Sequence, residues 1–126
     1  MAGRKKLLLF GDNKSLRNDF FEHMWGEFEM LSCSHHTDDI QGHLAYYDPD
    51  ALVLCLYKET REELSGLKII KETLKKRGCS FIVAGDGIKC DEFERTMPHL
   101  ADFIVRRSRV NTYQAMESQI ASYLNT

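Results

Sequence analysis

The fold of this sequence is decided by the stretch PDALVLCL, which occupies residues 49–56. Within it, the six residues from Ala51 to Leu56 are all apolar, and Pro49 and Asp50 break the segment that precedes them. A short run that is apolar on both faces is typical of a central strand in a parallel sheet, because helices cover both faces of such a sheet. We therefore predict an α/β protein built around this strand.

Apolar runs alternate with amphipathic segments five times along the chain. The other predicted strands are residues 6–10, 28–33, 80–84 and 102–105. Helices are predicted after Ser15, after Thr37, after the capping box of Thr60 and Glu63, over residues 91–96, and after Asn111. This alternation predicts a (βα)₅ domain, a doubly wound five-stranded parallel sheet with right-handed crossovers and helices on both faces.

The composition excludes several classes of protein. A length of 126 residues supports one domain over 1–126, either a whole protein or the N-terminal domain of a longer one. The 17 basic and 19 acidic side chains give a net charge of −2, and 43% of the residues are hydrophobic. A disordered acidic tail is excluded because the apolar content is too high, and direct binding to nucleic acid is not expected of a chain this near to neutral.

The sequence also lacks the marks of a secreted or membrane protein. No apolar run approaches the roughly 20 residues that a spanning helix needs, and no signal peptide follows the basic residues at positions 4–6. The four cysteines, at positions 33, 55, 79 and 90, have no CxxC spacing. We therefore expect a cytoplasmic protein with free thiols and no contact with a membrane.

Functional sites of such sheets lie at the carboxyl ends of the strands. The sequence segments at these ends are LLLFGDN at 7–13, PDALVLC at 49–55, IVAG at 82–85 and ADFIVRRS at 101–108. From about Lys5 to Leu124, this pattern resembles the receiver domain of two-component response regulators. The resemblance implies a flavodoxin-like receiver fold with strand order 2-1-3-4-5 and a role in phosphorelay signalling.

The resemblance also implies that the phosphorylation site is degenerate. Asp12 matches one of the two acidic residues that bind Mg²⁺ in receivers, Gly11 replaces the other, and Cys55 stands at the phosphoacceptor position. Because Mg²⁺ prefers carboxylate oxygens and a thiolate is a soft ligand, we expect no resident metal or cofactor, no enzymatic activity and no stable phosphorylation. Aspartates at both position 55 and position 11 are predicted to restore a divalent-cation site.

The sequence differs from the receiver pattern at two further positions. Ala84 stands where receivers carry a hydroxyl, and Arg107, or Arg106 if the alignment slips by one, replaces their lysine. Together with Arg109, these arginines form a basic patch, and acidic residues precede them at 91, 92 and 94. We expect an effector domain or partner protein to be regulated by contact, and a weak homodimer to form through this face.

Two other functions are open at this stage. One is a sensor of a small ligand or anion at the strand ends, near Arg106 and Arg107. The other is a redox-sensing or nucleophilic role for Cys55. The alternative interpretation is that Cys55 serves only as a small buried hydrophobic residue. For Asp12, residual metal binding competes with an ordinary role in a turn or at a helix start.

A last cluster in the sequence consists of Cys33, His35, His36, Asp38 and Asp39. These are zinc-ligating residue types, but they do not show the repeated spacing of structural zinc sites. We expect a loop followed by the first turn of a helix, where acidic side chains suit the helix dipole, and no metal.

Overall fold

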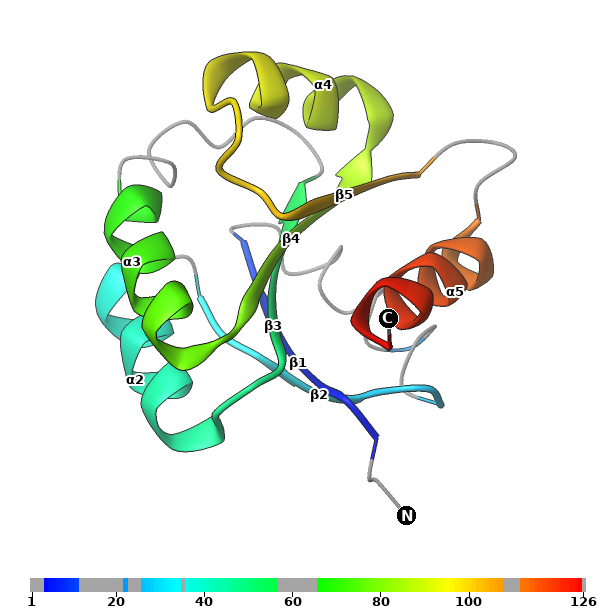
Figure 1. Cartoon of the computed structure of the whole chain (residues 1–126). Coiled ribbons are helices and arrows are strands. Elements are labelled where there is room, and N and C mark those ends of the chain that lie inside the picture. Colours follow the sequence, from blue (N-terminus) through cyan, green and yellow to red (C-terminus); the bar gives the residue numbers. More distant parts are fainter. Residues whose placement is uncertain are drawn as a thin grey trace.

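The computed structural model describes residues 4–11, 22, 26–34, 36–56, 66–107 and 112–125 of the chain. Five parallel strands form a single sheet in the order β2-β1-β3-β4-β5, and helices lie on both of its faces (Figure 1). The predicted α/β class, the doubly wound parallel sheet and the strand order 2-1-3-4-5 are therefore confirmed. The stretch at residues 49–56 supplies β3, the central strand, and all of its residues from Ala51 to Leu56 are buried.

The strands and helices agree with the predicted alternation. The strands are β1 (Lys6–Phe10), β2 (Glu29–Ser32), β3 (Ala51–Leu56), β4 (Ser80–Asp86) and β5 (Phe103–Arg107). The helices in the described part of the chain are α2 (Thr37–Tyr47), α3 (Leu67–Arg77), α4 (Gly87–Thr96) and α5 (Tyr113–Leu124). The helix predicted after Ser15 and the capping box of Thr60 and Glu63 lie outside the described residues. None of the described helices combines the length and apolarity needed to cross a membrane.

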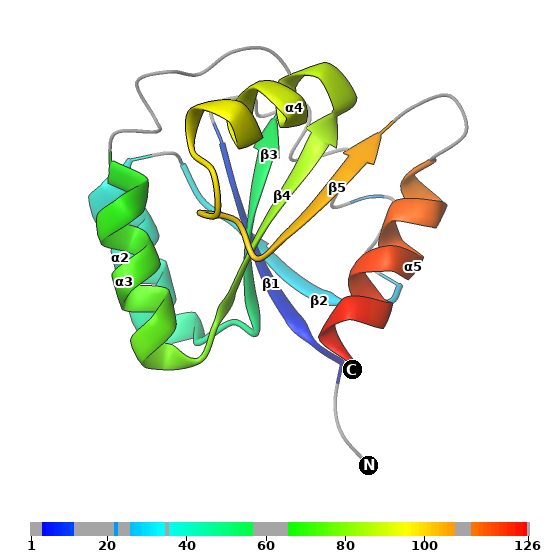
Figure 2. The same ribbon diagram turned by 45° about the horizontal axis from the view of Figure 1, so that its top comes forward.

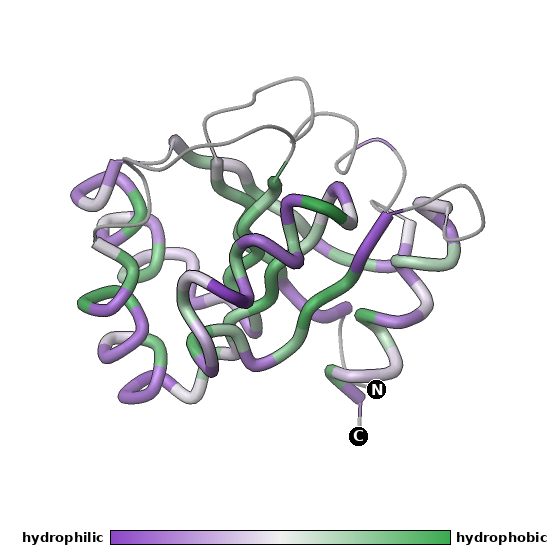
Figure 3. The backbone as a smooth tube through the Cα atoms, turned by 90° about the horizontal axis from the view of Figure 1, so that it is seen from above, coloured by the Kyte–Doolittle hydropathy of each residue, from purple (hydrophilic) through white to green (hydrophobic). Residues whose placement is uncertain are grey.

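The sheet separates two apolar layers, because successive side chains of a strand point to opposite faces. Leu52, Leu54 and Leu56 of β3 pack toward α2, α3 and α4, whereas Ala51, Val53 and Cys55 pack toward α5. Figure 2 shows α2 and α3 on one side of the sheet and α5 on the other, and Figure 3 shows the apolar strands inside the more polar helices.

Three predicted helix starts need correction. Thr37 is the first residue of α2, and the N-cap is His36, whose side chain makes no capping bond. The cap of α5 is Thr112, whose hydroxyl accepts a hydrogen bond from the amide of Ala115, while the predicted cap Asn111 lies outside the described residues. The helix expected over 91–96 begins at Gly87, because Asp86 caps it by accepting from the amide of Lys89 at 3.1 Å.

Asp102 fixes the start of β5 against the rest of the sheet. Its Oδ2 accepts a hydrogen bond from the backbone amide of Phe81 at 2.8 Å, and its Oδ1 forms an ion pair with Lys71 Nζ at 2.7 Å. One side chain thus joins α3, β4 and the turn before β5. This contact holds the register in which Ala84 lies beside Val105, and so it helps to position the carboxyl end of β5.

Candidate functional site

The carboxyl ends of β3, β4 and β5 point toward the same end of the sheet, near α4 (Figure 2). Cys55 of β3 lies opposite Ala84 of β4, and Ala84 lies opposite Val105 of β5. On the other side of β3, Gly11 follows the last residue of β1 directly, and its Cβ position faces the carbonyl group of Cys55. The tertiary structure therefore brings Gly11, Cys55 and Ala84 together, as the sequence predicted. Asp12 lies outside the described residues.

Cys55 is enclosed by apolar side chains. It is 1% exposed and belongs to the apolar layer under α5, together with Ala84, Val105 and Met116. Its thiol donates a long hydrogen bond, 4.0 Å, to the carbonyl oxygen of Val53 on the same strand. Reactive cysteines are solvent-accessible and lie in electropositive surroundings. The burial of Cys55 therefore favours the interpretation of a small core residue over a redox sensor or nucleophile.

Gly11 occupies a backbone conformation that is unfavourable for other residues. Its φ is +147°, and a Cβ atom added to it would lie 2.8 Å from the carbonyl oxygen of Cys55. Glycine is the residue that tolerates both the positive φ and this close approach. The expectation that aspartates at positions 11 and 55 restore a cation site needs correction, because a side chain at position 11 meets the backbone of β3.

Gly85 makes the same kind of contact on the opposite side of β3. Its φ is +149°, and a Cβ atom there would overlap the carbonyl oxygen of Leu56. The strand predicted from the sequence ended at residue 84, whereas β4 continues through Gly85 to Asp86. An isolated glycine at the end of an apolar run is also a signal for close backbone approach, and that signal was available in the sequence.

The two arginines at the end of β5 lie on opposite faces of the strand, as successive strand residues must. Arg106 faces α4, where its Nε lies 2.7 Å from Asp91 Oδ1 and one terminal nitrogen lies 2.9 Å from Glu94 Oε1. The hydrogen bond to Asp91 raises the pKa of Arg106 above its usual range. Arg107 faces α5, with its guanidinium carbon 4.8 Å from the centroid of the Tyr113 ring.

This arrangement bears directly on the hypothesis of an anion sensor. An anion site built from both arginines requires the two guanidinium groups to converge on one ligand, but Arg106 and Arg107 point to different helices. The charge of Arg106 is balanced within the chain by two carboxylates. The described geometry therefore does not favour an anion site between these arginines. Arg109 lies outside the described residues.

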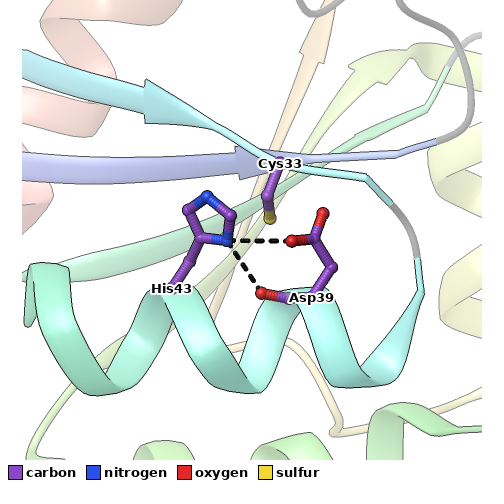
Figure 4. Close-up of side chains that lie close together, drawn as sticks. All are labelled: Cys33, Asp39 and His43. Atoms are coloured by element: carbon purple, nitrogen blue, oxygen red, sulfur yellow. Dashed lines mark hydrogen bonds and ion pairs between the residues drawn. The ribbon is translucent and has the colours of Figure 1, made fainter.

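A second group of chemistry-bearing side chains lies at the end of β2 and the start of α2 (Figure 4). Cys33, Asp39 and His43 each direct one potential ligand atom into the same space. Of the cluster noted in the sequence, Cys33 and Asp39 belong to this group, and His35 lies outside the described residues. Sequence reasoning missed His43, although its position four residues after Asp39 places both on one face of a helix.

Comparison with known proteins shows which solved structures have a similar fold. No family model matches the sequence, and no curated protein does. The complex of the P1 domain of CheA3 with CheY6 from R. sphaeroides contains a similar chain, with a TM-score of 0.74, 11% identity, and coverage of 99% of this chain and 100% of that one. A DNA-binding response regulator of the LuxR family from Staphylococcus aureus aligns with a TM-score of 0.68 and 20% identity, over 97% and 99% of the two chains.

A third similar structure is described as an atypical orphan response regulator with a phosphorylation-independent regulatory mechanism. It aligns with a TM-score of 0.68 and 15% identity, over 95% of each chain. At these identities the likeness concerns the fold. The chain therefore has the fold of response-regulator receiver domains.

Proposed function

We propose that this chain is a degenerate receiver domain, or pseudo-receiver, that takes part in two-component signalling without being phosphorylated. It acts in the cytoplasm through contacts with other proteins and has no catalytic activity of its own. The observation that carries this proposal is the buried thiol of Cys55 at the carboxyl end of the central strand. The resemblance to receivers assigns the phosphoacceptor carboxylate to this position.

The neighbours of Cys55 support the same proposal. Gly11 supplies no carboxylate, and the carbonyl of Cys55 occupies the space that a side chain there would need. Ala84 is fully buried and offers no hydroxyl to a phosphoryl group. Phosphoryl transfer depends on metal ions and polar groups that neutralise the charge on the transferred group. Among the residues that the structure describes beside Cys55, Gly11, Ala84 and Val105 do not provide these groups.

Acetyl phosphate and Mg²⁺ will leave the mass of the intact protein unchanged, because the phosphoacceptor position holds a buried thiol. The measurement is intact-mass spectrometry, with a receiver domain of known activity as the positive control. The Cys55→Asp variant will also remain without an adduct, since Gly11 and Ala84 are unchanged. An adduct mapped to the end of β3 in the wild-type chain refutes the proposal.

Contacts with other proteins are proposed for the face formed by α4, β5 and α5. Among the similar structures, one is a complex with the P1 domain of CheA3 and another is a DNA-binding response regulator. For the present chain, a partner protein or an effector domain is proposed by analogy with these proteins. The exposed side chains of this face include Ile88 on α4, which is 70% exposed, and Arg107 on β5.

A weak homodimer through the same face is part of the proposal. The structure changes its electrostatic basis, because Arg106 already pairs with Asp91 and Glu94 inside one chain. The association therefore depends on Ile88 and Arg107, and each exposed charge pair adds about 0.2–1 kcal/mol at most. We expect sedimentation equilibrium to show a dimer that weakens with salt and is weaker still in Arg107→Glu.

The control for this experiment is Lys68→Glu, which reverses an exposed charge on α3, away from the proposed face. It will leave the dimer unchanged. If the wild-type chain is a monomer at every concentration and ionic strength, homodimer formation is refuted and contact with a different protein remains.

A further inference from the structure

Cys33, Asp39 and His43 converge at the β2 edge of the sheet, and β1 lies between β2 and β3. Cys33 follows β2 directly, Asp39 lies in the first turn of α2, and His43 lies one turn later. Their sulfur, carboxylate oxygen and ring nitrogen all lie within 4.8 Å of one another. Figure 4 shows the thiol pointing into the space between the carboxylate and the imidazole ring.

The carboxylate of Asp39 is held in place by a residue on the preceding loop. Ser34 donates two hydrogen bonds to Asp39 Oδ2, from its amide at 2.9 Å and from its hydroxyl at 2.8 Å. The other oxygen, Oδ1, is thereby directed toward His43 Nδ1, at 3.1 Å. These hydrogen bonds lower the pKa of Asp39. Bonds of this type orient the carboxylate ligands of metal ions in other proteins.

We propose that Cys33 Sγ, Asp39 Oδ1 and His43 Nδ1 bind a thiophilic divalent metal ion of the Zn²⁺ class. Sulfur, imidazole nitrogen and carboxylate oxygen are the three ligand types that Zn²⁺ takes, and a thiolate selects against Mg²⁺ and Ca²⁺. Ordinary zinc bond lengths with tetrahedral angles place neighbouring ligand atoms about 3.2–3.6 Å apart. The separation of 3.1 Å between Oδ1 and Nδ1 is already near this range, and the sulfur has to approach both atoms.

The site is open to solvent on one side. Cys33 is buried, but the side chains of Asp39 and His43 are 40% and 24% exposed. An ion can therefore enter between them, and a water molecule completes a four-coordinate shell. Without metal, His43 Nδ1 lies 2.8 Å from the carbonyl oxygen of Asp39. On binding, this nitrogen turns its lone pair to the ion, its ring proton moves to Nε2, and the thiol proton passes to the buffer.

A bound ion would link β2 to α2, and it would do so without involving Cys55 or the end of β3. The metal site and the proposed signalling function can therefore fail separately. A chain that binds zinc and also accepts a phosphoryl group refutes the proposed function alone. A chain that does neither refutes the metal site alone.

The test begins with the full chain, freed of metal by a chelator and titrated with Co²⁺ under reducing conditions. We expect d–d absorption of low-coordinate cobalt together with a sulfur-to-cobalt charge-transfer band, and loss of both when Zn²⁺ is added. Zinc at 100 times its dissociation constant will raise the melting temperature by about 5–10 °C. Cobalt binding without a sulfur band, or no binding at all, overturns the proposal.

Variants then identify the ligands. His43→Gln and Cys33→Ala will each weaken binding 100-fold or more, whereas Ser34→Ala, which removes one of the two hydrogen bonds to Asp39 Oδ2, will weaken it about 10-fold. His99→Asn is the matched control for the imidazole, since asparagine tolerates the positive φ of this exposed residue. Cys90→Ala is the control for the buried thiol, because Cys33 and Cys90 belong to the same apolar layer.

Both controls will bind with the wild-type affinity. His43 is only half-buried, so His43→Gln will fold even if Cys33→Ala does not, and the cobalt spectrum of the wild type reports the sulfur ligand independently. Unchanged binding in folded His43→Gln overturns the site, as does a loss of affinity in the controls equal to that in the ligand variants.

Discussion

Replacement of Gly85 by alanine will lower the free energy of unfolding by about 3–5 kcal/mol, a large part of the roughly 6–19 kcal/mol expected for a domain of this length. The backbone of Gly85 has a φ of +149°, which is unfavourable for any residue with a Cβ atom. The added methyl group would also overlap the carbonyl oxygen of Leu56. β4 cannot shift to relieve this overlap, because it pairs with β3 on one side and β5 on the other.

The measurement is urea unfolding of the wild type and three glycine variants. Gly11→Ala will lose less than Gly85→Ala, about 2–3 kcal/mol, because its Cβ atom lies 2.8 Å from the Cys55 carbonyl oxygen and β1 ends just before it. Gly42→Ala is the control, since Gly42 lies inside α2 with nothing within 4 Å of its Cβ position. That variant will gain up to about 1 kcal/mol. A loss below 1 kcal/mol in Gly85→Ala contradicts the prediction.

Raising the pH from 8 to 10.5 will destabilise the protein through two buried thiols. Burial raises the pKa of Cys79 and that of Cys90 from 9.0 to about 12. In the unfolded chain both thiols lose their protons above pH 9, whereas in the folded chain they keep them until about pH 12. The unfolded state is therefore favoured as the pH rises through this window, and each thiol contributes a loss of about 2 kcal/mol at pH 10.5.

The double variant Cys79→Ala and Cys90→Ala isolates this effect. It starts from a lower stability at pH 8, because two buried sulfur atoms are removed, but it will lose about 4 kcal/mol less than the wild type between pH 8 and pH 10.5. All other ionisable residues are the same in both chains, so the difference belongs to the two thiols. Guanidinium unfolding at the two pH values measures it, and equal losses in the two chains contradict the prediction.

Much of the candidate site could be predicted from single residues at the ends of apolar runs. The positions of Gly11, Cys55 and Ala84 follow from strand order, since the ends of parallel strands meet at one edge. Whether Cys55 is exposed could not be predicted, because burial depends on side chains from β4, β5 and α5 that are distant in the sequence. The same holds for Arg106, whose acidic partners lie on a preceding helix, 15 and 12 residues earlier in the chain.

The architecture of this protein follows from its sequence, because hydrophobic periodicity is a local property and five alternations of strand and helix leave few topologies. The sequence also indicated which residues align with the site positions of receivers, as far as the resemblance implies them. The tertiary structure alone decided how close the backbones come at Gly11 and Gly85, which face each arginine takes, and that His43 joins Cys33 and Asp39. These features depend on distances between segments that are remote in the sequence. The hydrophobic pattern within one segment carries no information about such distances.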